Sequence, residues 1–232
     1  MMSKSWILAA LLLLSACSRQ ETERPLPPRQ AARETPPAGP IDPRSKPDGR
    51  PVLVCFGDSI TAGQGLDPGE IYPDVLQREL DRRGARFRVV NQGVSGDTTQ
   101  DGLARLAQVI AEKPRIVVLE LGANDGLRGL PLTGIRRNLE ELITGLRATD
   151  ALVVLAGITL PPNYGPDYIR GFEAIYKDLS AEYKLPLIPF LLEGVGGSPR
   201  LMQSDGLHPT AEGARIVAHT VLRALDPLLA QR

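Results

Sequence analysis

Short, continuous runs of apolar residues recur along this chain from residue 51 onward, and they constrain its fold more than any other feature. Four runs occupy residues 52–56, 116–119, 151–156 and 185–190, and a shorter candidate covers 87–90. A strand with one face in solvent alternates apolar and polar residues, whereas a strand covered on both faces is apolar throughout. The runs therefore predict strands of a parallel sheet.

Helical patterns lie between these runs. They cover residues 72–83, 98–112, 135–149, 168–183 and 210–229. In the second, Leu103, Leu106, Val109 and Ile110 recur at the spacing of one helix face. Strands that alternate with helices predict an α/β sandwich with right-handed crossovers. We see no internal repeat and no second domain.

The first 17 residues have the layout of an export signal. Lys4 precedes an apolar stretch from Trp6 to Leu14, and small residues then lead to Cys17. The stretch is far shorter than the ~20 residues that a membrane-spanning helix needs. The segment resembles the bacterial lipobox, whose cysteine is diacylated and becomes the new N-terminus. We expect lipidation of Cys17; the alternative is an ordinary secretory signal with an incidental cysteine.

Residues 18–50 predict a disordered tether. They are rich in proline and charge, and Leu26 and Ile41 are their only large apolar residues. Such a segment cannot bury enough surface to offset the conformational entropy that folding costs. The sequence thus predicts a signal peptide at 1–17, a tether at 18–50 and one folded domain at 51–232.

Charge and cysteine content exclude several classes of protein. Basic and acidic residues number 27 each, so net charge does not indicate a nucleic-acid partner or an anionic membrane surface. We expect no nucleic acid, and contact with a membrane only through Cys17. The two cysteines, Cys17 and Cys55, have no zinc-type spacing and cannot form a multi-bridge framework. Cys55 lies in the first predicted strand, where we expect a small buried apolar residue.

Four short polar segments stand near the ends of predicted strands. They are residues 57–60, 91–93, 122–125 and 205–208. The first three follow the first, second and third strands, and the carboxyl ends of parallel strands meet at the edge where ligands bind. Together the segments hold a serine, a histidine with a nearby acid, and amide donors. That is the minimum set for acyl transfer through a tetrahedral intermediate.

Ser59 is the candidate nucleophile, and His208 is its candidate base. A serine between a strand and a helix is often only an N-cap, but the other three segments favour the nucleophile. His219, the only other histidine, lies inside the last helical pattern. Asp205 precedes His208 by three residues, close enough in a turn to orient its ring, although Asp-Gly is also common turn chemistry. The two histidines would lie roughly 16 Å apart on one helix, so we reject a metal site.

Gly93 and Asn124 are the candidate oxyanion donors. A glycine lets its amide approach the substrate, and the asparagine carboxamide supplies a second N–H; loss of one such donor typically costs ~2.7–4 kcal/mol. The alternatives are a turn glycine with positive φ at Gly93 and a loop cap at Asn124. We assign Asp125 a structural role that braces the loop.

Other serine sites and cofactor loops do not fit the sequence. Position 61 is threonine, so residues 57–61 lack the Gly-x-Ser-x-Gly elbow, and Ser95 fits a turn. The Gly63-Gln64-Gly65 segment lacks the third glycine of a dinucleotide fingerprint, and no Walker lysine follows a glycine-rich turn. We expect no cofactor.

Ser59, Gly93, Asn124 and His208 together resemble the four signature residues of the SGNH hydrolase superfamily, also called GDSL lipases/esterases. The resemblance runs from about residue 52 to 229 and favours the bacterial thioesterase I/lysophospholipase L1/arylesterase branch. Residues 94–98, 119–129 and 162–165 carry the likeness to that branch. Ile60 departs from it, since leucine is commoner there.

The resemblance implies a flavodoxin-like three-layer α/β/α sandwich with a five-stranded parallel sheet. It also implies a cofactor-free serine mechanism on acyl thioesters, lysophospholipids and small aryl or alkyl esters. Ser59 would be the nucleophile, with its own amide joining Gly93 and Asn124 in the oxyanion hole. His208 would act as base and then acid, oriented by Asp205.

The substrate and the cellular site stay open at this point. A carbohydrate O-acetylesterase of the same superfamily and a catalytically inert binding lipoprotein are the alternatives. Residues 161–165 and 127–132 are expected to shape the acyl pocket. Ser18 and Arg19 after the cysteine resemble outer-membrane sorting, so we expect a periplasmic protein tethered to the outer membrane.

Overall fold

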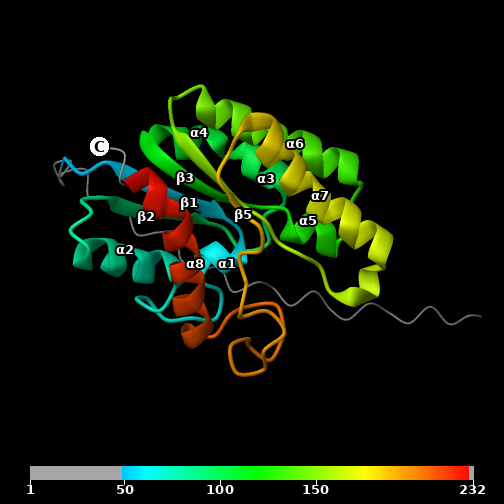
Figure 1. The fold of residues 1–232 in the computed structure, drawn as a ribbon. Coiled ribbons are helices and arrows are strands. Elements are labelled where there is room, and N and C mark those ends of the chain that lie inside the picture. The colour runs from blue at the N-terminus through cyan, green and yellow to red at the C-terminus, as the bar shows by residue number, and fades with distance from the viewer. Residues whose placement is uncertain (1–48, 230–232) are drawn as a thin grey trace, which may run out of the picture. The chain divides into compact units, whose positions relative to one another are not determined.

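The structure is a computed structural model that describes residues 49–229 (Figure 1). The expected signal peptide, Cys17 and nearly all of the tether lie outside these residues. The strands are β1 (Val52–Gly57), β2 (Arg88–Gly93), β3 (Pro114–Glu120), β4 (Leu152–Ala156) and β5 (Leu187–Ile188). The helices are α1 (Ser59–Ala62), α2 (Tyr72–Arg82), α3 (Thr99–Ala104), α4 (Leu106–Ala111), α5 (Ala123–Leu127), α6 (Leu132–Arg147), η1 (Pro162–Tyr164), α7 (Pro166–Tyr183) and α8 (Ala211–Leu229).

The five strands form one parallel sheet in the order β2-β1-β3-β4-β5. β2 pairs with one edge of β1, and β3 pairs with its other edge. The direction in which strands are added therefore reverses between β1 and β3. In open α/β sheets the crevice outside the carboxyl ends at such a reversal is where ligands bind. Ser59 follows β1 and Asn124 follows β3, so both flank this point.

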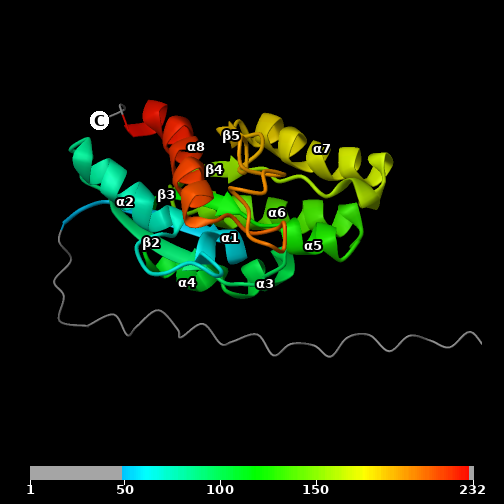
Figure 2. The same cartoon turned by 90° about the horizontal axis from the view of Figure 1, so that it is seen from below.

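Two groups of helices enclose the sheet. α2 packs against α8, whereas α6 packs against α3, α4 and α7 (Figures 1 and 2). Every residue of β1 is buried, and so is every residue of β3 except Arg115. A strand that is buried at successive positions must be covered on both faces. The α/β sandwich predicted from the apolar runs is therefore confirmed.

Cys55 lies in the centre of this core. Its side chain is fully buried in β1, as predicted, and burial raises the pKa of its thiol to about 12. The thiol is free and protonated at neutral pH. Cys55 thus packs as a small apolar residue.

The structure differs most from the sequence prediction in three elements. The single helix predicted at 98–112 breaks at Arg105, where the backbone has φ −114° and ψ 10°. The strand predicted at 185–190 is reduced to Leu187–Ile188, because Pro186 and Pro189 cannot donate to a ladder. β2 extends through Gly93, so the segment 91–93 pairs with β1 rather than following the strand.

No helix in the described part of the chain is long and apolar enough to cross a membrane.

Candidate active site

Ser59 begins the short helix α1 directly after β1. Asp58 is the N-cap of this helix: its carboxylate accepts a hydrogen bond from the Ile60 N–H at 3.0 Å. Gly63 ends the helix in the left-handed region, with φ 79°. Because Asp58 supplies the cap, the Ser59 hydroxyl has no capping role and is left for another contact.

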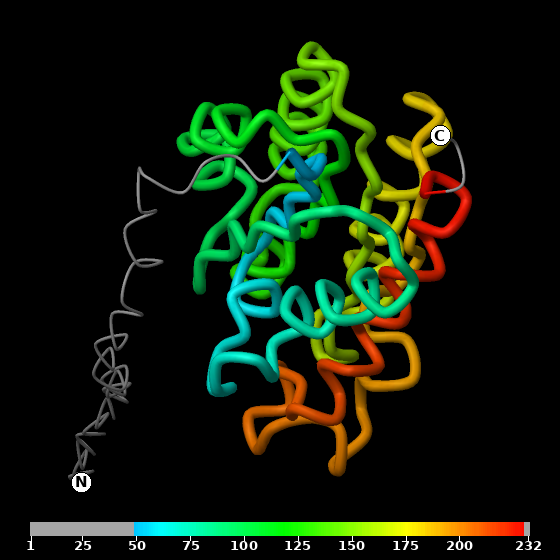
Figure 3. The backbone as a smooth tube through the Cα atoms, turned by 90° about the vertical axis from the view of Figure 1, so that its left-hand side faces the viewer, coloured from blue at the N-terminus to red at the C-terminus, as the bar shows by residue number. Residues whose placement is uncertain are grey.

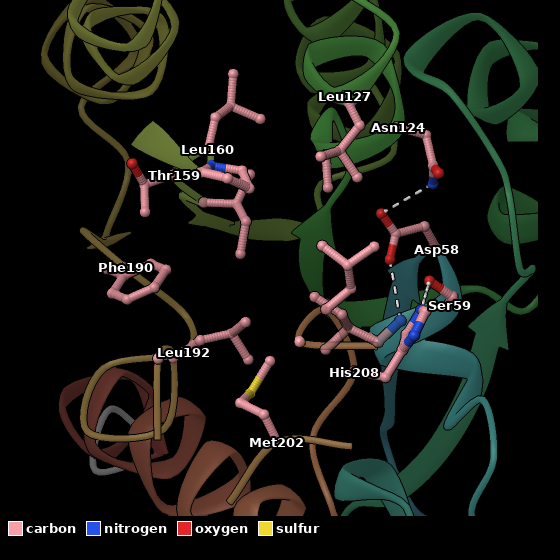
Figure 4. Close-up of a pocket in the computed structure, with 18 of the residues that line it drawn as sticks. Asp58, Ser59, Asn124, Leu127, Thr159, Leu160, Phe190, Leu192, Met202 and His208 are labelled. Atoms are coloured by element: carbon pink, nitrogen blue, oxygen red, sulfur yellow. Dashed lines mark hydrogen bonds between the residues drawn. The ribbon is translucent and has the colours of Figure 1, made fainter. Parts of the chain in front are cut away.

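That contact is with His208. The Ser59 Oγ lies 2.8 Å from His208 Nε2, and His208 Nδ1 lies 2.6 Å from an oxygen of Asp205 (Figure 4). The second oxygen of Asp205 accepts from the N–H groups of Leu207 and His208, at 2.9 and 3.1 Å. Burial acts to raise the pKa of Asp205, but these hydrogen bonds outweigh it and hold the pKa below its ordinary value. The three side chains therefore form a continuous hydrogen-bonded chain that ends in a carboxylate.

The loop that carries His208 is tied to the turn after α1. The Gln203 side chain donates to the backbone oxygens of Gln64 and Pro209, at 2.8 and 2.9 Å. Gln203 also donates its own N–H to the His208 carbonyl at 2.7 Å. Figure 3 shows the segment before α8, in orange, beside the turn that follows β1, in cyan. These bonds bring His208 to Ser59 from the far end of the sequence.

Asn124 lies in α5, on the other side of Ser59. Its side-chain amide donates to the Asp97 carbonyl at 2.9 Å and, less closely, to Asp58 Oδ2 at 3.3 Å. The neighbouring Asp125 accepts from the Thr99 N–H and hydroxyl at 2.8 and 2.6 Å, which is the bracing contact that the sequence predicts. The longer bond to Asp58 is the one that an incoming acceptor would replace most easily.

The structure does not bring Gly93 into the site. Gly93 pairs within β2, its N–H donates to the Asn91 side chain at 2.8 Å, and it is absent from the residues that line the cavity. Its φ is not positive either; a Cβ there would lie 2.2 Å from the Ala62 backbone nitrogen. Close packing of β2 against α1 is therefore what requires a glycine.

Gly96, and not Gly93, lies beside the cavity as a candidate oxyanion donor. It lines the same cavity as Ser59 and Asn124, and its φ of 89° favours glycine. Within residues 49–229, neither the Gly96 N–H nor the Ser59 N–H donates to a protein acceptor. Gly96 belongs to residues 94–98, one of the segments that carries the family resemblance, so the sequence did hold a signal for it.

The carboxyl groups of Asp58 and Glu120 lie close together next to Ser59. Glu120 Oε2 accepts from the Thr61 hydroxyl at 2.8 Å and from the Asp58 N–H at 3.2 Å, while Oε1 has no partner among the described residues. Burial raises the pKa of Asp58 to about 6, and burial together with the Asp58 charge raises the pKa of Glu120 well above its ordinary value. Burial and the neighbouring Asp58 charge therefore favour the protonated form of Glu120. Sequence reasoning did not single it out, since a glutamate at a strand end carries no motif of its own.

A cavity of about 610 Å³ opens beside Ser59 and His208. Figure 4 shows Leu160, Phe190, Leu192 and Met202 standing across from Ser59. The apolar lining of the cavity consists of Ile60, Ala123, Leu127, Ile158, Leu160, Pro161, Pro162, Phe190, Leu192, Met202 and Leu207. Of the segments expected to shape a pocket, Leu127, Pro161 and Pro162 contribute, whereas residues 128–132 and 163–165 do not. No lysine or arginine lines this cavity.

The other histidine stays away from the site. His219 lies in α8 with half of its side chain exposed, and its ring is 3.9 Å from Glu79. In the part that the structure describes, no group of three or more histidine, cysteine, aspartate or glutamate side chains is arranged to hold a metal ion.

Comparison with known proteins identifies the family. The profile described as GDSL-like lipase/acylhydrolase matches residues 55–216. The chain belongs to this family. It is thereby an acylhydrolase, an enzyme that transfers an acyl group to water.

Individual relatives agree with this assignment. The chain is 47% identical to esterase TesA of Pseudomonas aeruginosa over 179 residues, which cover 77% of this chain and 89% of that protein. It is 38% identical to thioesterase 1/protease 1/lysophospholipase L1 of Escherichia coli over 179 residues, with coverage of 77% and 85%. The crystal structure of a psychrotrophic esterase from a Pseudoalteromonas species, inhibited by monoethylphosphonate, matches with a TM-score of 0.73 at 31% identity. That match covers 77% of this chain and 98% of the other.

Proposed function

We propose that the chain hydrolyses carboxylic esters and thioesters of apolar acyl groups through an acyl-enzyme on Ser59. The observation that carries the proposal is the hydrogen-bonded chain from Ser59 through His208 to Asp205, at the mouth of an apolar cavity. His208 takes the Ser59 proton as the hydroxyl attacks the carbonyl carbon, and the Asp205 carboxylate stabilises the imidazolium. His208 then protonates the departing alcohol or thiol.

The oxyanion of the tetrahedral intermediate would bind the N–H groups of Ser59 and Gly96 and the side-chain amide of Asn124. Both backbone donors are unused in the described structure, and Asn124 replaces its long bond to Asp58 with one to the oxyanion. Gly96 takes the place of Gly93 in this scheme. His208 then takes a proton from a water that attacks the acyl-enzyme, and the same donors stabilise the second intermediate. This intermediate breaks its bond to Ser59 Oγ, which takes the proton from His208, and the carboxylic acid leaves.

The cavity supports an acyl chain as the recognised group. Its lining is mostly aliphatic and aromatic, with no cationic side chain, and its volume is in the usual range for a ligand site. A carbohydrate acetyl ester would place a small acyl group and a polar sugar against this surface. Acyl esters and thioesters with several methylenes therefore fit better, in line with the similarity to an esterase and a thioesterase.

The test is a substrate panel with two serine variants. Purified protein is assayed on p-nitrophenyl acyl esters, acyl thioesters, lysophospholipids and acetylated sugars at matched concentrations. Ser59→Ala should abolish turnover, and Ser180→Ala, which changes a serine of α7 that does not line the cavity, should retain it. Full turnover by Ser59→Ala would remove Ser59 from the mechanism. A folded wild type that neither turns over these substrates nor reacts with a fluorophosphonate would favour an inert binding protein.

We also propose that the enzyme is exported and anchored through a lipid on Cys17, as a periplasmic protein held at the outer membrane. The support is the sequence alone: a short apolar stretch is followed by the small residues Ser15 and Ala16, by Cys17 and then by a proline-rich segment. Mass spectrometry of the mature N-terminus tests it. A diacylated Cys17 is expected, and an unmodified terminus beyond Cys17 would end the proposal.

A further inference from the structure

One arginine connects the end of β1, β2 and the loop that follows β2. Arg105 donates through Nε to the Asp97 carboxylate at 2.5 Å, through Nη1 to the Gln92 carbonyl at 2.8 Å and through Nη2 to the Gly57 carbonyl at 2.9 Å. Its guanidinium carbon lies 4.6 Å from the centre of the Phe56 ring. The side chains of Arg105 and Asp97 are both only 12% exposed.

Two of the three acceptors, Gly57 and Asp97, are adjacent to parts of the proposed machinery, and Gln92 lies in β2. Gly57 ends β1, directly before the turn that presents Ser59. Asp97 follows Gly96 in the chain, and the carbonyl of Asp97 accepts the Asn124 amide at 2.9 Å. The guanidinium thus connects the nucleophile turn to residues 94–98, here called the glycine loop, which carries one proposed oxyanion donor and orients another.

The glycine loop has few other bonds to the sheet. Val94 donates to the Gly57 carbonyl at 3.1 Å, and Asp97 donates back to Val94 at 3.2 Å. Arg128 reaches the Gly96 carbonyl at 2.9 Å from the solvent side. Arg105 contacts the other side of the loop, and its side chain is largely buried. Arg105 is also the residue at which the predicted helix 98–112 breaks.

We propose that Arg105 is a positioning residue that holds the Gly96 and Asn124 donors in place for the oxyanion. The inference rests on the proposed function. Oxyanion donors stabilise a transition state only if they are fixed before the reaction, since a misplacement of about 1 Å can cost 10²-fold in rate. A planar guanidinium donates in three directions at once, whereas the single nitrogen of lysine cannot reach three acceptors with the same geometry.

The experiment compares Arg105→Lys with Arg136→Lys in the full chain. Arg136 pairs with Glu182 between α6 and α7, away from the cavity, so its lysine variant controls for loss of an arginine ion pair. Arg105→Lys should lower kcat by about 10- to 100-fold and leave KM for a p-nitrophenyl ester within about two-fold. Asp97→Asn, which removes the charged partner but keeps its shape, should lower kcat in the same way. Normal kcat in a folded Arg105→Lys variant would overturn the proposal.

A double variant separates positioning from general loosening of the fold. If Arg105 acts through Asn124 and Gly96, Arg105→Lys should cost clearly less in an Asn124→Ala background than in the wild type. An equal loss in both backgrounds would contradict that route.

Amide hydrogen exchange gives a readout that does not depend on turnover. Arg105→Lys should speed exchange in residues 94–98 and leave α6 and α7 unchanged. Unchanged exchange in the loop would contradict the inference, whereas an inactive wild type with the expected exchange pattern would count against the proposed function alone.

Discussion

His208 Nε2 lies 2.8 Å from Ser59 Oγ, although 149 residues separate the two in the sequence. Gln203 secures this approach by bonding to both the turn after α1 and the chain at Pro209. The end of β1 positions Ser59, and the loop before α8 positions His208. The site therefore forms only when these two distant segments come together.

The charge on Asp205 should matter more than its shape. Asp205→Asn keeps the size of the side chain but removes the carboxylate that faces His208 Nδ1, so we expect kcat to fall by ~10²–10⁴-fold with little change in KM. Steady-state kinetics with a p-nitrophenyl ester measure this. Asp178→Asn, on the exposed face of α7, is the control. Equal rates for the two variants would show that Asp205 does not assist His208.

The two glycines should respond differently to alanine. At Gly93 a Cβ meets backbone atoms of Thr61 and Ala62, so Gly93→Ala should lower the free energy of unfolding by about 3 kcal/mol or more. At Gly96 a Cβ meets nothing within 4 Å, and only the positive φ opposes it, at about 1–2 kcal/mol. Urea denaturation tests this difference. Among folded variants, Gly96→Ala should show the lower kcat; a fully active Gly96→Ala would exclude this loop from the oxyanion hole.

Glu120 should make stability fall as pH rises. Its pKa is raised in the folded state, as is that of Asp58, so these two groups bind more protons in the folded protein than in the unfolded chain above about pH 4. Each unit of pH in that window then lowers the free energy of unfolding. Glu120→Gln cannot titrate and still offers an oxygen to Thr61. We therefore expect the variant to lose less unfolding free energy between pH 5 and 8 than the wild type does.

The measurement is denaturant unfolding at several pH values. Glu193→Gln, whose side chain is 72% exposed, serves as the control and should follow the wild type. A Glu120→Gln profile that parallels the wild type would show that Glu120 is ionised in both states.

Filling the cavity should change acyl-chain preference. Leu127 lines the cavity close to Asn124, and Leu127→Trp would occupy space that a long acyl chain needs. We expect kcat/KM for a decanoyl ester to fall at least ~10-fold relative to an acetyl ester. Leu152→Trp, on a surface position 40% exposed and outside the cavity, should leave the ratio unchanged. An unchanged ratio for Leu127→Trp would place the acyl chain elsewhere.

The sequence by itself determined the layered fold and the candidates for the proton-transfer chain. Continuous apolar runs can be satisfied only by strands covered on both faces, and a chain with two histidines leaves few bases to choose from. Ser59, Asp205 and His208 could therefore be selected before any coordinates were known. Their side chains perform the proton transfer, and the identity of a side chain is known from the sequence.

Only the tertiary structure decided which glycine faces the cavity and which groups support the donors. A backbone N–H is present at nearly every residue, so its use depends on the direction that the local φ and ψ impose and on whether another acceptor has already taken it. Gly93 and Gly96 look alike in sequence, yet one donates to Asn91 within β2 and the other has its N–H unused beside Ser59. Arg105 and Glu120 likewise acquire their contacts only when β1, β2 and β3 are placed side by side.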